Sequence, residues 1–377
     1  MADLNSPAAP IVRQPRGAIK INGTLVWGWT SFDVDNNRHN AADTFKAELA
    51  VGGLPAAFNA AWFATQTSIR VELFATDKPS DPANYNGPAS DSLILGQVDH
   101  IDFDPAEGTI SLSGRDLTAL LIDTKTSENH QNQTSSAVAT LLAQRHGLTP
   151  IVTATTTRIG QFYEIDHTDI NQQQSEWDLL LRLADFEGFD VFVKGNSLYF
   201  QPKAQDNGDR YAIVWTPPTD DSAAPLANTT TLKFSRDLTI AKGVTVEVRS
   251  WNAKQKKAFT ATWPKAVKHI KPGQSSNDNL TYHFHVAGLT QDQASAKAQA
   301  FYNQIVQHMV QLDADLPADS VLTCNSIIAV RGTGTAFDQS YYPSSVKRSL
   351  SATEGYRMTV SGKNISEEVE NAEANAS

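Results

Sequence analysis

Short runs that alternate apolar with polar residues fill the first third of the chain. Successive side chains of a β-strand point to opposite faces of a sheet, so such alternation is typical of half-buried strands. The runs are Ala18–Gly23, Leu25–Trp29, Phe32–Asp35, Thr44–Leu49, Ile69–Phe74 and Ile110–Ser113. They predict an antiparallel sheet or barrel, with the turn-rich stretch Pro79–Pro88 as a surface loop.

After about residue 119 the spacing of apolar residues becomes helical. Thr134 or Ser135 is placed to cap a helix that stops at His146–Gly147, and a second helix runs from near Ser175 to Gly188. The apolar positions of these helices are Val138, Leu141 and Leu142, then Trp177, Leu180, Leu181 and Ala184. A hairpin follows, with the strands Phe189–Val193 and Ser197–Gln201 joined through Gly195–Asn196.

The second half of the chain begins with residues 203–230, which are polar and rich in Pro, Asp and Ala, as linkers are. A third helix is predicted after Thr290, which is spaced to form a capping box with Gln293. Its apolar stripe is Ala294, Ala298, Phe301, Ile305 and His308, and the strand-like runs around it are Thr230–Phe234, Val244–Arg249, Ser326–Val330 and Tyr356–Val360. The acidic tail Glu367–Ser377 is predicted to be frayed.

Together these patterns predict a β-rich α+β protein. We expect a first β domain over residues 1–118 and a mixed α/β domain with a linker over 119–228. A second β domain is expected over 229–369, with an α/β insertion around 263–318, before a flexible tail at 370–377.

Composition narrows the function. The 377 residues carry a formal net charge of -10, which argues against a dedicated nucleic-acid binder, and the densest basic stretch, from Lys254 to Lys271, is interpreted as a solvated face or an interface. The single cysteine, Cys324, excludes an intramolecular disulfide, and its apolar surroundings favour a small buried side chain over a reactive thiol. The start of the chain lacks the pattern of a signal peptide and no run has the roughly 18–20 apolar residues of a membrane span, so synthesis in a cytoplasm is expected.

One polar cluster has the first ligand spacings of a calcium loop, at Asp33, Asp35 and Asn37. However, Arg38 stands where the loop needs glycine, and Thr44 stands where a bidentate glutamate belongs. A strand end with polar side chains is therefore favoured.

Two further clusters alternate along predicted strands. His283 and His285 would point to the same side and could share a metal, but no carboxylate or histidine follows at ligand spacing, so ordinary strand residues are favoured. Asp99, Asp102 and Asp104, with His100, are interpreted as a polar strand face rather than an acid/base pair. Gly332-Thr-Gly334 is predicted to be a turn, and the common nucleophile, phosphate-loop and zinc-helix motifs are absent. No catalytic, cofactor-binding or metal-binding residue is predicted, and the protein is not expected to be an enzyme.

An internal echo links the two β regions. The stretch Ile110–Leu117 matches Met358–Ile365 in chemical type at each of its positions. In both, alternating apolar residues predict a half-buried strand, and Ser-Gly followed by a basic residue is expected to turn the chain. A duplicated domain would explain the echo, and a chance match within 377 residues is the alternative.

The order of these segments resembles the baseplate hub proteins of contractile phage tails, of the late-control type, and the amino-terminal part of type VI secretion spike proteins. The stretches that carry the resemblance are Asp43–Phe45, Ser113–Leu117 with its following helix, Ala143–Leu148, Gln174–Ala184, Glu187–Phe189, Lys194–Phe200, Leu289–Ala298, Phe337–Tyr341, Val346–Ser351 and Gly355–Tyr356. Members often carry histidine at or beside the position of Arg348, and the loop Pro79–Pro88 and the linker have no clear counterpart. These departures concern loop contacts more than the fold.

The resemblance implies a homotrimer in which each chain supplies two tube-like β-barrel domains. The resulting pseudo-sixfold ring would join a sixfold tail tube to a threefold spike and leave a channel for tape measure protein and DNA, without sequence-specific binding, membrane insertion or a cofactor. Such a protein is a structural component of the virion, assembled in the host cytoplasm. The alternatives are a tail component that binds glycans or hydrolyses cell walls, and the spike base of a secretion system.

Overall fold

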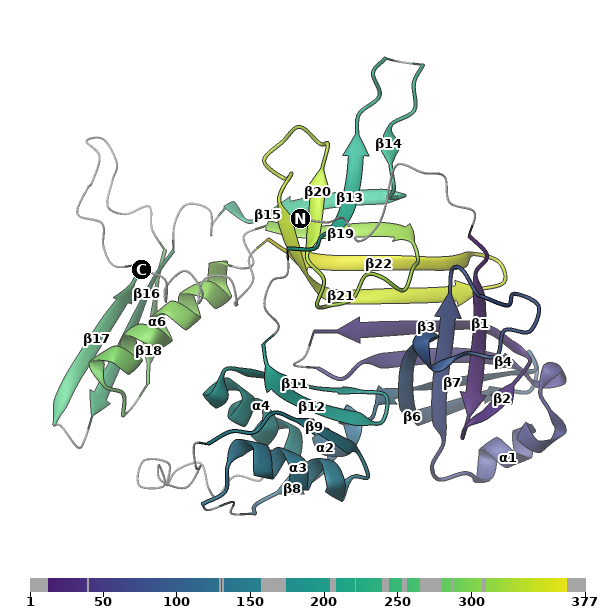
Figure 1. Ribbon diagram of the computed structural model, residues 1–377, viewed down its shortest axis with the longest axis horizontal. Coiled ribbons are helices and arrows are strands. Elements are labelled where there is room, and N and C mark those ends of the chain that lie inside the picture. Colours follow the sequence, from purple (N-terminus) through teal and green to yellow (C-terminus); the bar gives the residue numbers. More distant parts are fainter. Residues whose placement is uncertain are drawn as a thin grey trace. The chain divides into compact units, whose positions relative to one another are not determined.

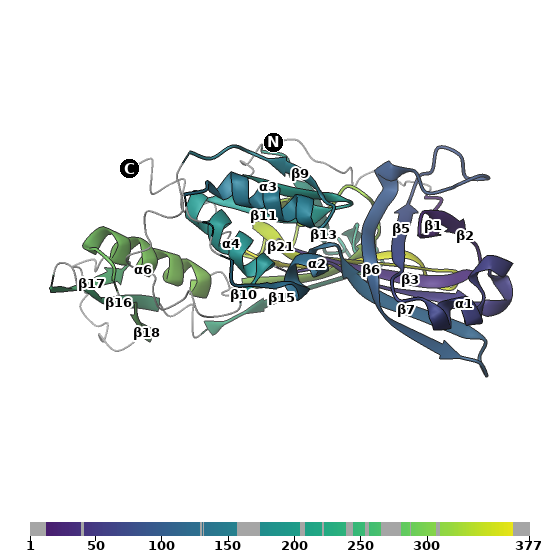
Figure 2. The same cartoon turned by 90° about the horizontal axis from the view of Figure 1, so that it is seen from below.

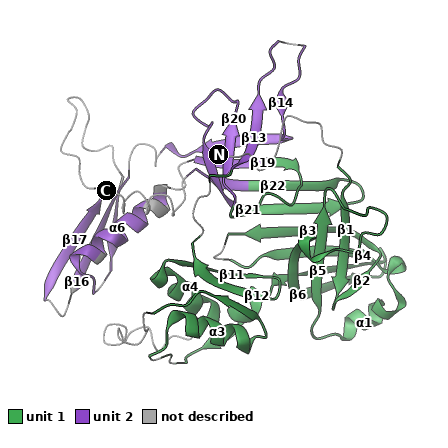
Figure 3. Cartoon of the chain, viewed as in Figure 1, with its two compact units in different colours: residues 1–209, 315–325, 345–360 green, residues 210–314, 326–344, 361–377 purple. Residues whose placement is uncertain are grey.

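The computed structural model describes residues 13–38, 41–128, 130, 132–156, 174–203, 208–220, 222–238, 244–252, 256–264, 280–286, 288–306 and 310–364. The chain divides into two compact units (Figure 3). Unit 1 holds residues 1–209, 315–325 and 345–360, and unit 2 holds residues 210–314, 326–344 and 361–377.

A β domain forms the first part of unit 1 (Figure 1). Its strands are β1 (Arg16–Ile21), β2 (Thr24–Val26), β3 (Trp29–Asn37), β4 (Thr44–Ala50), β5 (Arg70–Thr76), β6 (Ser92–Asp104) and β7 (Thr109–Asp116). The second half of β21 (Ser340–Ser351) pairs antiparallel with β3, and the order continues through β4, β7, β6, β5, β1 and β2. The antiparallel pairing predicted from the alternating runs is confirmed.

Alternation along these strands places one set of side chains in a core. Ile19, Val34, Leu49, Val71 and Leu112 are all fully buried. Burial of such a side chain contributes about 1.5–3 kcal/mol relative to an exposed position. Three short helices lie between β4 and β5: η1 (Val51–Gly53), η2 (Ala56–Phe58) and α1 (Ala60–Thr65). A further one, η3 (Ala89–Asp91), directly precedes β6.

An α/β subdomain completes unit 1. Its elements are α2 (Thr118–Asp123), β8 (Lys125–Thr126), α3 (Ser135–Arg145), β9 (Thr149–Val152), β10 (Gln174–Ser175), α4 (Glu176–Glu187), β11 (Phe189–Lys194) and β12 (Ser197–Pro202). β12 pairs antiparallel with β11 and parallel with β9, and Figures 1 and 2 show α3 and α4 packed beside this sheet. One apolar core joins the helices to the sheet.

Local signals fix the ends of both long helices as predicted. The hydroxyl of Thr134 accepts a hydrogen bond from the backbone N–H of Ala137, and Ser175 forms a capping box with Asp178. α4 ends at Gly188, whose φ of 69° lies in the left-handed region that glycine adopts without strain.

Unit 2 contains two sheets. One includes β13 (Tyr211–Thr216), β14 (Leu226–Ala227), β15 (Thr231–Arg236) and β20 (Ile328–Arg331), with β20 parallel to β13 and antiparallel to the first half of β21. The other is β17 (Lys257–Trp263), β16 (Val244–Asn252) and β18 (Leu280–His285), covered on one face by α6 (Gln291–Val306). β19 (Val310–Pro317), β21 and β22 (Gly355–Lys363) contain residues of both units.

Two predictions need correction. The linker predicted over 203–230 contains β13, where Tyr211, Ala212 and Ile213 are buried, because polar neighbours on both sides conceal a short apolar strand. The expected turn at Ser-Gly is also wrong, since Gly114 lies within β7 and Gly362 lies within β22.

The glycines of the echo serve close strand packing instead. A Cβ at Gly114 would lie 2.0 Å from the carbonyl oxygen of Gln97 in β6, and a Cβ at Gly362 would lie 3.1 Å from the carbonyl oxygen of Tyr342. The two strands also share an alternating pattern of buried and partly exposed residues. The echo is therefore structural as well as chemical.

Some predictions fall outside the described residues. These are the positions of Lys254, Lys265, Lys268, Lys271 and His308, the side chain of Gln293, and the tail Glu367–Ser377. Within the described part of the chain, no helix has the length and hydropathy needed to cross a membrane.

Candidate functional site

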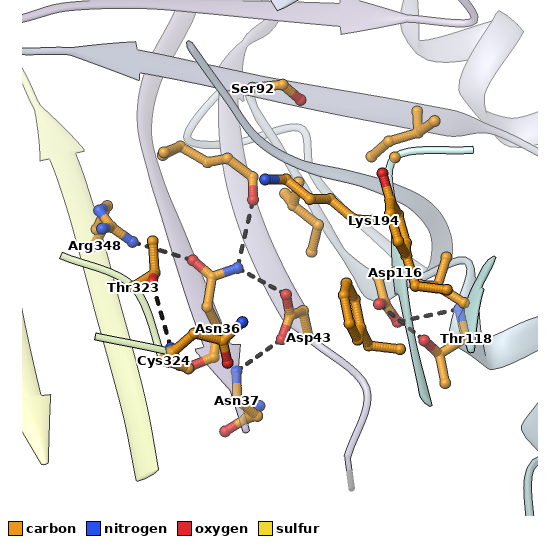
Figure 4. Close-up of a pocket in the computed structure, with 18 of the residues that line it drawn as sticks. Asn36, Asn37, Asp43, Ser92, Asp116, Thr118, Lys194, Thr323, Cys324 and Arg348 are labelled. Atoms are coloured by element: carbon orange, nitrogen blue, oxygen red, sulfur yellow. Dashed lines mark hydrogen bonds between the residues drawn. The ribbon is translucent and has the colours of Figure 1, made fainter. Parts of the chain in front are cut away.

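A cavity of about 430 Å³ lies within unit 1 (Figure 4). Its lining comes from both parts of the unit. The β domain supplies the end of β3, the start of β4, the approach to β6 and the end of β7, and the α/β subdomain supplies the turn between β11 and β12. The segment 320–325 closes a further side.

Asp43 lines this cavity and accepts hydrogen bonds from the end of β3. Its two carboxylate oxygens accept hydrogen bonds from the side-chain amide of Asn36 and the backbone N–H of Asn37, each at 2.7 Å. The Asn36 amide also contacts the carbonyl oxygen of Leu93 at 3.4 Å (Figure 4). Burial raises the pKa of Asp43 because desolvation disfavours the charged form, although both hydrogen bonds oppose this effect.

Asp116 stands where β7 gives way to α2. Its carboxylate accepts hydrogen bonds from the backbone N–H of Thr118 at 3.2 Å and from the hydroxyl of Thr118 at 2.9 Å. Its own N–H donates to the backbone carbonyl of Asp43 at 2.9 Å. Burial, followed by repulsion from Asp43, raises the pKa of Asp116 to about 8.

Arg348 on β21 is the buried cation of this region, with 4% of its surface exposed. Its guanidinium donates to the backbone carbonyls of Asp319 and Leu322 and to the side-chain oxygen of Asn36. These bonds tie the segment after β19 to the end of β3. The guanidinium makes no hydrogen bond to the carboxylate of Asp43 or Asp116 among the described contacts.

Cys324 lies in the same cavity wall, and its thiol donates to the backbone carbonyl of Asn36 at 3.1 Å. Burial raises its pKa to about 12. A thiol that stays protonated is a poor nucleophile, so the predicted buried role of Cys324 is confirmed.

The α/β subdomain contributes Lys194 and aromatic side chains to the cavity. Lys194 extends into the cavity in Figure 4. Phe192 and Tyr199 stack with ring centroids 4.8 Å apart, and Trp177 lines the wall with its indole N–H unpaired. The cavity lining thus combines three aromatic side chains, Trp177, Phe192 and Tyr199, with carboxylates and with the cations Lys194 and Arg348.

Another buried carboxylate lies inside the α/β subdomain. Glu176, at the start of α4, is fully buried and forms an ion pair with Arg145 and a hydrogen bond with Nε2 of His146 at 2.5 Å. Arg145 also pairs with Glu128 at 2.7 Å. The end of α3 is thereby joined to the start of α4.

The other predicted clusters are where the sequence placed them. Asp33, Asp35 and Asn37 lie on β3, as a strand rather than a calcium loop. Asp99, Asp102 and Asp104 lie on the outward part of β6, where Asp99 forms an ion pair with Arg115 at 2.7 Å. Gly332 and Gly334 both have positive φ, and Asp338 accepts hydrogen bonds from the turn between them.

The prediction for the histidine pair was incomplete. His283 and His285 lie exposed on β18, but Glu247 places a carboxylate oxygen 3.3 Å from Nδ1 of His283. The two residues face each other because β16 pairs in parallel with β18, across a sequence separation that local spacing does not reveal. Within the described ranges, no group of three or more His, Cys, Asp or Glu side chains is arranged to hold a metal ion.

The sequence signals did not single out Asp43, Asp116 or Arg348 as one cluster. Asp43 precedes β4, Asp116 ends β7 and Arg348 lies on β21, so only the folded sheet brings them together. Polar residues are common at the ends of strands, so the sequence does not identify such a site unless the pairing of the strands is known.

Solved structures of other proteins share the fold of this chain. No family model and no curated protein matches this chain. A tail protein from Neisseria meningitidis MC58 matches 93% of this chain and 96% of its own, at 14% identity and a TM-score of 0.65. The prophage MuSo2 43 kDa tail protein from Shewanella oneidensis aligns with 93% of this chain and over 98% of its own length, at 15% identity and a TM-score of 0.63.

A type VI secretion system component from E. coli is also similar, over 92% of this chain and 77% of its own, at 12% identity and a TM-score of 0.50. Because the tail proteins match along nearly their whole lengths, the likeness extends beyond one common subdomain. The chain is a β-rich α+β protein with the fold of phage tail proteins.

Proposed function

We propose that this protein is a structural hub of a phage tail baseplate, in the virion, where three copies join the sixfold tail tube to a threefold spike. The observation that carries the proposal is the match to phage tail proteins over 93% of the chain. The proposed role is mechanical and does not include catalysis.

In this proposal the β domains over residues 1–118 and 229–369 are tube-like barrels. Support comes from β7 and β22, which share a burial pattern and a glycine that lies against a neighbouring strand. Three copies of a chain can meet a sixfold partner only when each copy presents two similar surfaces. Two such domains in each of three chains satisfy that requirement.

The expected partners follow from this geometry. The ring would contact the tail tube or its initiator protein on one side and the central spike on the other, with tape measure protein and DNA passing through. A net charge of -10 suits a conduit for DNA because like charges repel. Assembly is proposed to take place in the host cytoplasm.

Electron microscopy of the purified full chain tests the proposal directly. We expect threefold rings in which each subunit contributes two barrel densities, and a mass of three chains by mass photometry. A chain that stays monomeric alone and also fails to join tube or spike proteins would contradict the proposal. Turnover of peptidoglycan or surface glycans by the pure protein would favour a hydrolytic tail component instead.

A further inference from the structure

The hairpin of β11 and β12 presents polar and aromatic side chains on the sheet face turned away from the α/β core. Alternate residues of both strands belong to that core, so the residues between them project from the opposite face. Three of these line the cavity of unit 1: Phe192, Lys194 and Tyr199. The cavity is thus built against a face that the core of the subdomain does not use.

Two groups on this face have no polar partner among the described residues. The ammonium of Lys194 extends into the cavity and makes no hydrogen bond or ion pair with them (Figure 4). The hydroxyl of Tyr199 likewise makes no hydrogen bond within the described ranges. Stacking on Phe192 covers one face of the Tyr199 ring. Both residues therefore retain groups for a further partner.

The β domain side of the cavity supplies hydrogen-bond acceptors in fixed positions. Asn36 and Asn37 orient the two carboxylate oxygens of Asp43, and each oxygen keeps a lone pair that these bonds do not use. The side chain of Asn37 donates from its nitrogen to the backbone carbonyl of Ala42, which leaves its own oxygen as an acceptor. The cavity therefore offers donors from the subdomain and acceptors from the β domain.

This combination selects against several classes of ligand. A phosphorylated molecule would meet the carboxylates of Asp43, Asp91 and Asp116 in a partly buried site, where like charges repel. A wholly apolar molecule would cover the Lys194 ammonium and the Asp43 carboxylate without replacing the water that they lose. Hydroxyl groups both donate and accept, so a ring that carries several of them satisfies both sides of the cavity at once.

We propose that the cavity is a binding site for a pyranose sugar, with its ring on Tyr199 and its hydroxyls bonded to Lys194 and Asp43. The C–H groups of a pyranose face are weakly positive and pack against the negative face of an aromatic ring. The volume of about 430 Å³ falls within the roughly 300–1,000 Å³ of small-molecule sites, which occur preferentially where two domains meet. A sugar bound in this way would contact both parts of unit 1.

Saturation-transfer NMR of the full chain with methyl pyranosides of glucose, galactose and N-acetylglucosamine tests the site. For ligands of this size we expect a dissociation constant on the order of 1 mM for at least one of them. Sorbitol is equally rich in hydroxyls but has no ring, and inorganic phosphate is the anion control, so neither should bind. Cellobiose, in which the ring is one residue of a chain, distinguishes a glycan from a free sugar as the natural source.

Two substitutions locate the binding. Lys194→Met keeps most of the side-chain length and removes the ammonium, and Tyr199→Leu removes the aromatic ring. Each should weaken binding by about tenfold, and circular dichroism checks that each variant folds. Lys125→Met, which changes an exposed lysine of β8 outside the cavity, should leave the affinity unchanged.

Hydrogen exchange of the unaltered chain gives a readout that needs no variant. At ten times the dissociation constant, the sugar should slow exchange through openings that release it by up to about elevenfold, at Asn36–Asn37 and at the turn Gly195–Asn196. Failure of all three pyranosides to bind, equal binding of sorbitol or phosphate, or binding that ignores both cavity variants would overturn the proposal. None of these results depends on whether the protein acts as a baseplate hub.

Discussion

Unit 1 buries carboxylates in two different electrostatic settings. Glu176 is fully buried and meets Arg145 and His146 directly, whereas Asp116 meets the N–H and hydroxyl of Thr118. Repulsion from Asp43 raises the pKa of Asp116 further. One site therefore stabilises a negative charge and the other opposes it.

The difference shows that burial alone does not determine what a carboxylate does. An ion pair between α3 and α4 joins two helices of one subdomain and requires Glu176 to be charged. Asp116 accepts hydrogen bonds from Thr118 instead, and burial and Asp43 raise its pKa. Four substitutions probe this contrast.

Removal of the paired carboxylate should have the largest effect. Glu176→Ala leaves Arg145 and His146 facing an empty buried position, and we expect a loss of about 3–5 kcal/mol in the free energy of unfolding. Urea denaturation followed by circular dichroism measures it. Glu128→Ala removes the exposed partner of the same arginine and should cost far less, so equal losses would contradict the distinction.

Removal of the buried cation should come next. Arg348→Met keeps most of the side-chain volume but leaves the carbonyls of Asp319 and Leu322 without their donors. We expect a loss of about 2–3 kcal/mol, measured by the same denaturation. Lys347→Met, at the exposed neighbouring position, is the matched control and should change stability by less than about 0.5 kcal/mol.

Neutralisation of the unpaired carboxylate should stabilise the protein. Asp116→Asn removes the cost of holding a buried acid, and we expect a gain of about 1–2 kcal/mol at pH 8. The raised pKa of Asp116 means that this gain is absent below about pH 4, where aspartate is protonated in both the folded and the unfolded chain. Thermal unfolding across this range gives the comparison, and a gain that does not depend on pH would point to packing instead.

The smallest effect belongs to an exposed ion pair. Asp123 pairs with Arg115 at 2.8 Å, and hydrogen bonds from Arg115 lower the pKa of Asp123. Asp123→Asn should cost about 0.5 kcal/mol at pH 7, because solvent screens the pair. The sign is opposite to that of Asp116, so this loss should vanish as pH falls through the lowered pKa. A loss that persists in strong acid would show that the charge is not its cause.

Local signals in the sequence predicted local structure well. The cap at Thr134, the start of α4 after Ser175, its end at the left-handed Gly188 and the hairpin turn at Gly195 all depend on atoms within a few residues. Each is stabilised by atoms whose neighbours in space are also neighbours along the chain. The sequence therefore shows both partners together.

Features made by distant segments were harder to predict. Glu247 meets His283 only through the pairing of β16 with β18, and the cavity of unit 1 needs β4, β7 and β21 in place. The register that brings them together depends on the packing of whole strands. β13 was missed for a different reason, because its short apolar run lies inside a polar stretch.

The pairing of β3 with β21 bears on how the protein is made. Asn37 pairs with Ser345, so β3 leaves the ribosome long before its neighbour exists. At about 5–20 residues per second, the remaining chain takes roughly 15–60 s to synthesise. During that interval one edge of the nascent sheet is open to strands of other chains. Because an open edge can pair with other chains, we expect the yield of folded protein to depend on chaperone capacity more than on the final stability of the fold.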